Sequence, residues 1–100
     1  MNAELKAKWV EALRSGRYKQ GRGFLRNAND EFCCLGVLCD VVDSSKWMHP
    51  AKDKAQFWDG LRLSVPDNIG LTFSQSSYAG LNDIQMKSFN EIADFVEANE

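Results

Sequence analysis

The residues of this sequence best suited to nucleophilic chemistry are three cysteines, Cys33, Cys34 and Cys39. A thiol at a helix N-terminus has a lowered pKa because the amide dipoles there stabilise the thiolate, and basic residues lie just upstream of Cys33 and Cys34. A nucleophilic thiol also needs a base, and the only imidazole, His49, stands in a Met-His-Pro segment that nothing fixes near a thiol. Cys33 and Cys34 are therefore candidates for a cysteine hydrolase, but the pattern favours buried packing cysteines.

Metal binding and disulfide formation are weakly indicated for the same side chains. The cysteines and His49 lack the C-x-x-C spacing of zinc sites, so we expect no metal and no cofactor. Their odd number, with two adjacent, does not fit the disulfide framework of a secreted protein. The N-terminus lacks the features of a signal peptide, and no apolar run reaches about 18 residues. We expect a cytoplasmic protein that does not contact a membrane.

A basic segment with two glycines, Lys19-Gln20-Gly21-Arg22-Gly23, precedes the cysteines. Amides freed by the glycines, together with Lys19, Arg22 and Arg26, could cradle a phosphate. The segment matches neither the Walker pattern nor G-x-G-x-x-G. A tight turn that leads into a hairpin is the favoured interpretation, because glycine is common wherever the backbone geometry is unusual.

A third candidate is the tripeptide Leu81-Asn82-Asp83. Asn and Asp favour turns and helix caps, which is the structural interpretation. In the functional interpretation, Asp83 accepts a hydrogen bond from Arg22 or from a ligand. The sequence leaves both interpretations open.

Charge is distributed unevenly along the chain, whose net charge is −2. Residues 1–26 hold seven basic and two acidic side chains, whereas residues 27–100 hold five basic and twelve acidic ones. The basic end could bind nucleic acid or a phosphate-bearing ligand, or it could offset the acidic end. The second alternative is favoured, since duplex-binding domains are usually basic overall. The candidate basic surface is Arg14, Arg17, Lys19, Arg22 and Arg26.

Amphipathic patterns predict a helix at each end of the chain. Apolar residues recur every four positions in Ala3–Ser15, and Gly16 is well placed to end that helix. Ser88 and Glu91 form a capping box, and the apolar stripe that follows predicts a helix over Phe89–Ala98. We expect the two helices to pack near each other, with basic and acidic outer faces that make the surface dipolar.

The centre of the chain predicts a short antiparallel sheet and a buried helix. Gly23–Arg26 and Glu31–Cys33 flank a turn-rich segment and are expected to form a hairpin. A helix should begin near Cys33 or Cys34 and be buried on most sides. Gly36 is unfavourable in a helix, which indicates close packing against another backbone.

Residues 44–79 are the least regular part of the sequence. Leu61–Val65 alternates like a short strand, and Pro66 is placed to begin a helical turn. Thr72–Gly80 is polar and is expected to be extended or a surface loop. With 100 residues, 44% of them hydrophobic and 26% charged, the chain should form one α+β domain over residues 1–100.

Four segments of the chain resemble a family of small proteins encoded by phages, prophages and bacteria. They read WVEALRSGRYKQGRGFLR, FCCLGVLCD, LND and SFNEIADFVE. A looser similarity to bacterial proteins of unknown function matches Gln20-Gly21, Cys33, Leu35-Gly36 and Asn82-Asp83. The resemblance implies a viral or mobile-element origin, and it carries no activity and no catalytic residue.

Our leading hypothesis is a small phage accessory protein that binds a host protein or nucleoprotein complex, for example an inhibitor of bacterial defence of the anti-CRISPR kind. It would act in the cytoplasm of the bacterial host through the basic surface. One alternative is a binder of a phosphorylated small molecule or nucleotide, using the turn from Lys19 to Arg26 with Asp83 nearby. The other is a cysteine hydrolase that uses Cys33 or Cys34. The sequence does not predict an oligomeric state.

Overall fold

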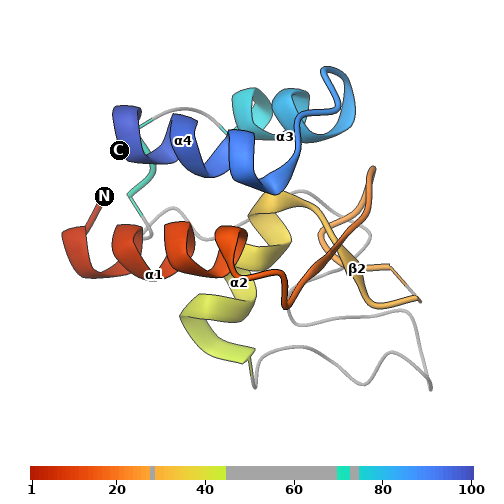
Figure 1. Ribbon diagram of the computed structural model, residues 1–100, viewed down its shortest axis with the longest axis horizontal. Coiled ribbons are helices and arrows are strands. Elements are labelled where there is room, and N and C mark those ends of the chain that lie inside the picture. Colours follow the sequence, from red (N-terminus) through yellow and green to blue (C-terminus); the bar gives the residue numbers. More distant parts are fainter. Residues whose placement is uncertain (28, 45–69, 73–74) are drawn as a thin grey trace.

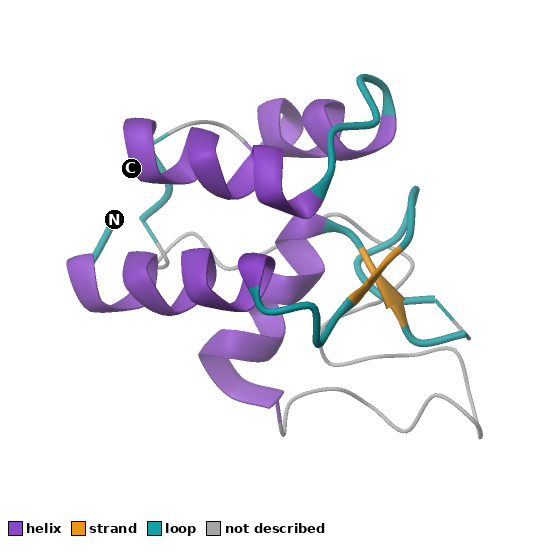
Figure 2. Cartoon of the chain, viewed as in Figure 1, coloured by secondary structure: helices purple, strands orange, loops and turns teal. Residues whose placement is uncertain are grey.

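Four helices and a two-stranded sheet make up the described part of the chain, residues 1–27, 29–44, 70–72 and 75–100, in this computed structural model (Figures 1 and 2). The elements expected at Leu61–Val65 and Pro66 lie outside these residues, as does His49. None of the helices in these ranges has the length and hydropathy that a membrane span requires. The elements in chain order are α1 (Ala3–Arg14), β1 (Lys19–Gln20), β2 (Glu31–Phe32), α2 (Cys34–Asp43), α3 (Gln75–Asp83) and α4 (Phe89–Asn99).

Helices α1 and α4 form where the sequence predicts them. The Asn2 side chain caps α1 by accepting hydrogen bonds from two backbone amides, and Gly16 follows the helix with a φ of 78°. In α4 the capping box of Ser88 and Glu91 is complete, and the predicted stripe is buried. The two helices lie side by side with opposite chain directions (Figure 1), so the expected packing of the terminal helices is confirmed.

Helix α2 is the buried central helix that the sequence predicts. Cys33 is its N-cap residue, and the Cys33 Sγ accepts a hydrogen bond from the Gly36 amide at 3.4 Å. The side chains of Cys34, Leu35, Val37, Leu38 and Cys39 have no exposed surface. The Trp9 indole of α1 donates to the Cys34 carbonyl at 3.0 Å, which joins α1 to the first turn of α2.

Gly36 is where α2 meets another backbone. A Cβ atom at this position would overlap the carbonyl oxygen of Leu25 and lie 2.7 Å from its carbonyl carbon. Leu25 is fully buried, and its carbonyl oxygen accepts from the Cys33 amide at 3.3 Å. The expectation of close backbone packing at Gly36 is therefore confirmed, with Leu25 as the partner.

The predicted antiparallel sheet is wrong, because the two strands are parallel. Lys19 pairs with Glu31 and Gln20 with Phe32. What exists of the expected hairpin is one isolated antiparallel bridge between Arg26 and Phe32. The turn-rich residues before β2 do bring residue 26 back to residue 32, but the longer-range pairing of β2 with β1 sets the direction of the sheet.

Helix α3 is the second departure from the expected structure, because Thr72–Gly80 had been expected to be extended or a loop. Tyr78 provides the reason: its ring is buried and lies edge-on to Trp9 at 5.1 Å and to Phe95 at 5.8 Å. This tertiary packing outweighs the weak helix propensity of the serines and Gly80. Asn82 and Asp83, for which the structural interpretation is a turn or a helix cap, form the end of the helix.

The contact at Gly36 can be tested by substitution. Gly36→Ala should lower the free energy of unfolding by about 3 kcal/mol or more, because Leu25 and α2 must separate to admit the methyl group. Gly80→Ala in α3 is the matched control, since a Cβ there meets nothing within 4 Å; it should stabilise the protein by about 0.5 kcal/mol. Urea unfolding followed by circular dichroism measures both, and equal effects would contradict the assignment.

Candidate functional site

The candidate catalytic cysteines lie inside the molecule. Cys33, Cys34 and Cys39 are all free thiols with no exposed surface. Burial raises the pKa of Cys33 to about 11, although the Gly36 amide donates to its sulfur. Burial also holds the pKa values of Cys34 and Cys39 well above the ordinary range. The helix N-terminus therefore does not produce a reactive thiolate at Cys33, since desolvation outweighs it.

Ion pairs neutralise most of the candidate basic surface. Exposed pairs of this kind contribute about 0–1 kcal/mol each, but they bring a carboxylate to each cation and reduce the field that an anionic ligand would meet. The structure thus favours the alternative in which basic and acidic side chains offset each other. The pairs are Arg14 with Asp94 (2.6 Å) and Glu97 (3.2 Å), Arg17 with Glu11 (3.0 Å), Lys19 with Glu31 (3.4 Å) and Arg26 with Asp30 (2.7 Å).

Arg22 is the exception among the five cations. Its side chain is exposed, and no carboxylate in the described residues pairs with it. The amide of the preceding Gly21 donates to the Phe32 carbonyl at 2.8 Å, so this glycine does not offer its N–H to a phosphate. Of the three cations in the predicted phosphate cradle, Arg22 is the one without a carboxylate partner in the described residues.

Asn82 holds together two segments that are far apart in the sequence. Its side chain is fully buried. Its Oδ1 accepts from Gln20 Nε2 at 2.8 Å, and its Nδ2 donates to the Gly21 carbonyl at 2.9 Å and to Asp83 Oδ1 at 2.7 Å. We call these four residues the Asn82 network. They are the Gln-Gly and Asn-Asp pairs of the looser resemblance, and here Asp83 accepts from Asn82 rather than from Arg22.

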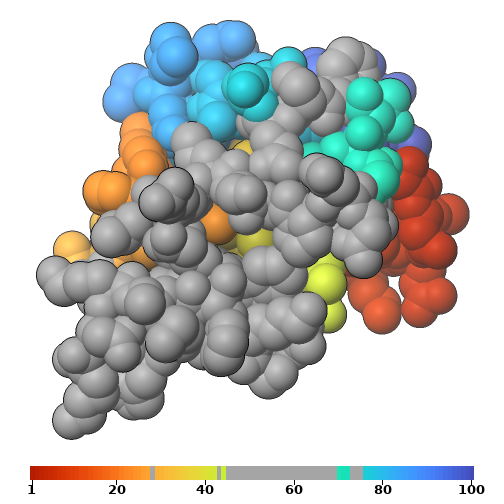
Figure 3. Space-filling model, turned by 180° about the vertical axis from the view of Figure 1, so that it is seen from behind, coloured from red at the N-terminus to blue at the C-terminus, as the bar shows by residue number. Residues whose placement is uncertain are grey.

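The Asn82 network places two loops next to each other. Residues 21–24 follow β1, and residues 84–88 connect α3 to α4. Gln20 Nε2 extends the link by donating to the Lys87 carbonyl at 2.8 Å. Figure 3 shows the atoms of the two loops, in orange and light blue, in contact at one edge of the molecule.

Exposed apolar side chains concentrate on these two loops. Among the described residues four large hydrophobic side chains are exposed, and three of them lie here: Phe24 (40%), Ile84 (82%) and Met86 (62%). The fourth, Val42 (38%), is on α2. We call Arg22, Phe24, Ile84 and Met86 the two-loop tip.

The connection from α3 to α4 is held in a defined conformation. The amides of Ile84 and Gln85 both donate to the Gly80 carbonyl, at 3.0 and 2.9 Å, and the Lys87 amide donates to the Leu81 carbonyl at 2.9 Å. Met86 has a φ of 54°, a left-handed conformation that costs a non-glycine residue about 1–2 kcal/mol. The surrounding hydrogen bonds therefore maintain a strained residue whose side chain points into solvent.

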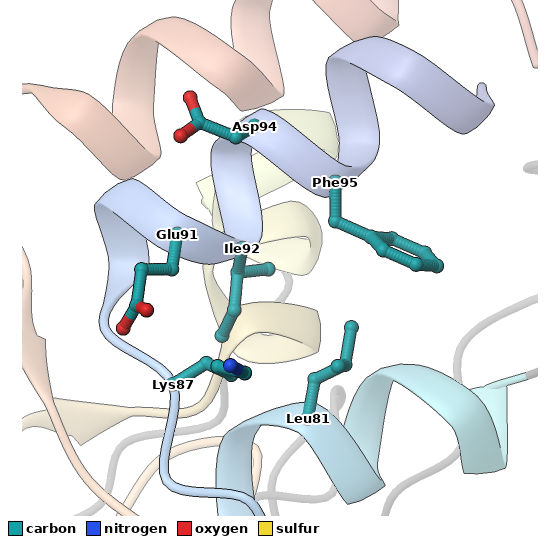
Figure 4. A pocket seen from close by; sticks show the side chains of 6 residues that line it. All are labelled: Leu81, Lys87, Glu91, Ile92, Asp94 and Phe95. Atoms are coloured by element: carbon teal, nitrogen blue, oxygen red, sulfur yellow. The ribbon is translucent and has the colours of Figure 1, made fainter.

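A groove lies beside the tip, between α3 and α4 (Figure 4). Its volume is about 270 Å³. The described residues contain no cluster of three or more His, Cys, Asp or Glu side chains that could hold a metal ion. The groove is lined by Leu81, Lys87, Glu91, Ile92, Asp94 and Phe95.

The sequence did not identify three of the tip residues, Phe24, Ile84 and Met86, as candidates for binding. Ile84 and Met86 follow the Leu81-Asn82-Asp83 tripeptide and precede the stripe of the last helix, so they belong to no periodic pattern. Apolar residues in a short connection are the signal that could have identified them. Hydrophobic periodicity alone does not distinguish an isoleucine that is exposed to solvent from one that is buried at the edge of the core.

Comparison with known proteins places most of the chain in one family. The family described as Domain of unknown function (DUF8296) matches residues 1–69. The chain belongs to this family. A comparison with curated proteins and one with solved structures each found no match to the chain. The DUF8296 match includes α1, both strands and α2, whereas α3, α4 and the second loop of the tip follow it.

The Asn82 network predicts a large effect for an isosteric change. Asn82→Asp should lower the free energy of unfolding by about 3 kcal/mol, because a carboxylate cannot donate to the Gly21 carbonyl and its charge would be buried. Asn90→Asp, an exposed change in the first turn of α4, should stay within about 0.5 kcal/mol of the wild type. Urea unfolding measures both free energies.

The effect of Asn82→Asp should also depend on pH. Burial raises the pKa of a carboxylate, and the protonated form is tolerated below that raised pKa. The deficit relative to wild type should therefore shrink between about pH 7 and about pH 5. A deficit that stays constant or grows over this range would contradict the buried position of the side chain.

The buried thiols predict slow alkylation. Iodoacetamide should leave Cys33, Cys34 and Cys39 unmodified in the native protein near neutral pH, since all three are inaccessible and their pKa values are raised. In guanidinium chloride all three should react. Mass spectrometry of the intact protein counts the adducts, and rapid labelling of one native thiol would restore the case for a cysteine nucleophile.

Proposed function

We propose that this chain is a binding protein that attaches to a protein of a bacterial host through the two-loop tip. The observation that carries the proposal is the concentration of exposed Phe24, Ile84 and Met86 on two hydrogen-bonded loops. Large apolar side chains exposed at neighbouring parts of a surface can mark interaction sites, and a few buried anchors supply most of the binding energy of an interface. Loops that are already ordered lose less conformational entropy on binding.

The resemblance to phage and prophage proteins supports the choice of partner. In this proposal the chain is a phage accessory protein that acts in the host cytoplasm, and inhibition of a defence complex of the anti-CRISPR kind is the form such binding would take. The five-residue basic surface expected from the sequence is reduced to Arg22, because its other members already have carboxylate partners. Arg22 would then add charge at the edge of an apolar contact.

The two alternatives receive less support from the described residues. A phosphorylated ligand would find Arg22, but the Gly21 amide is already used and Asp83 is bonded to Asn82. A hydrolase would require Cys33 or Cys34 to become accessible. Both alternatives stay predictions, and a nucleotide panel and the alkylation experiment test them.

The proposed binding surface can be tested by capture from a bacterial lysate. The wild type should retain a protein at a stoichiometric level, and nuclease treatment should leave that capture intact. Ile84→Asp and Met86→Asp should each reduce capture at least about tenfold, because an aspartate would be desolvated in the contact. These two side chains are so exposed that the fold should be unaffected.

The matched control is Val42→Asp, which places the same charge at an exposed apolar residue on α2, away from the tip. It should capture the same protein as the wild type, and the affinity of the purified partner should follow the same order. Equal capture by all variants would show that the tip is not the contact. Loss of capture on nuclease treatment would instead indicate a nucleic-acid partner.

A further inference from the structure

We propose that two copies of this chain pair reciprocally, with the tip of each copy seated in the α3–α4 groove of the other. The inference rests on the proposed function in one respect, which is that the tip is a binding surface. It adds a regulatory step, because a second copy would then compete with the host protein for the same side chains.

The groove has the size and chemistry to receive the tip. Figure 4 shows Leu81 of α3 opposite Phe95 of α4, with Ile92, Glu91 and Lys87 together on one side of them. Its volume of about 270 Å³ is below the roughly 300 Å³ at which pockets for drug-sized ligands begin. An apolar floor of this size suits one or two inserted side chains, such as Ile84 and Met86.

The charges on the two surfaces are complementary. Glu91 is exposed and forms no ion pair in the described residues; hydrogen bonds with Ser88 and the nearby positive charge of Lys87 lower its pKa. Arg22 at the tip is likewise exposed and without a carboxylate partner in those residues. Asp94 is different, since Arg14 already neutralises it. Arg22 at the tip and Glu91 at the groove, neither of which forms an ion pair within the described part of the chain, can pair between copies.

The positions of the two surfaces favour a closed dimer. The tip and the groove are contiguous, because Met86 directly precedes Lys87 of the groove, and Leu81 is one helical turn before Ile84. When a projecting surface and a groove lie side by side, a two-fold rotation brings each onto its complement in the other copy. Each contact is then made twice, and both sets of exposed apolar side chains are covered.

The oligomeric state in solution tests this pairing directly. Sedimentation velocity over a range of concentrations should show a monomer–dimer equilibrium for the wild type. Ile84→Asp should raise the dimer dissociation constant by about thirtyfold or more, while Val42→Asp should leave it unchanged. A wild type that is monomeric up to about 1 mM, or a dimer unaffected by Ile84→Asp, would overturn the proposal.

Glu91→Gln examines the groove without removing the helix cap, since glutamine also serves in a capping box. It should raise the dissociation constant roughly two- to fivefold and weaken its dependence on salt. Glu4→Gln removes an exposed charge on α1 and should have no effect. Arg22→Glu and Glu91→Lys should each weaken the dimer, and the two together in one chain should restore it. Failure of the combination to restore it would mean that these residues do not meet.

The same variants separate this inference from the proposed function. Glu91→Gln should weaken the dimer while leaving host-protein capture intact or increased, because the groove is outside the tip. Capture by a strictly monomeric wild type would overturn the pairing and retain the proposed function. A dimer that captures no stoichiometric host partner would retain the pairing and overturn the proposed function.

Discussion

The contact between Gly36 and the backbone of Leu25 is the constraint on which the rest of the described structure depends. It presses an extended segment directly onto the most deeply buried helix, at a distance that only a glycine allows. Once Leu25 is fixed there, the chain on either side has little freedom. The exposed residues 22–24 form the loop that leads into this contact, and Arg26 is positioned to meet Phe32. The first loop of the two-loop tip is thus a direct consequence of packing at α2.

Asn82 fixes the position of the second loop, residues 84–88, in the same way that the Gly36 contact fixes the first. A buried amide is costly unless its hydrogen bonds are satisfied, and here both its oxygen and its nitrogen have partners on another segment or on the neighbouring Asp83. An apolar side chain of similar size would fill the same space without specifying which loops meet. The polar group therefore contributes specificity of arrangement more than stability.

The sequence predicts those features whose causes are local. Helix α1 has its stripe and Gly16, α4 has its capping box, and the lone glycine in an apolar helix indicates the close contact at Gly36. The direction of the sheet and the existence of α3 depend on contacts between distant residues, such as the edge-on packing of Tyr78 against Trp9. Local sequence patterns do not reveal such contacts. The predictions of an antiparallel sheet and of an extended segment or loop at Thr72–Gly80 were therefore wrong for the same physical reason.

The charged residues show the same limit of prediction from sequence. Their ion pairs also change which surface is expected to bind a partner. Counting side chains identified a basic end correctly, but it did not reveal that Arg14 reaches carboxylates 80 and 83 positions away on α4. Such ion pairs occupy most of the basic residues in contacts within the chain. The feature that then distinguishes the surface is its exposed apolar side chains. Because burial of apolar area stabilises an interface without the desolvation cost that charges incur, Ile84 and Met86 would contribute more to the affinity of the proposed contact than the cations that the sequence singles out. The left-handed backbone at Met86 accompanies a side chain that points outward, and the hydrogen bonds of the connection hold both in place.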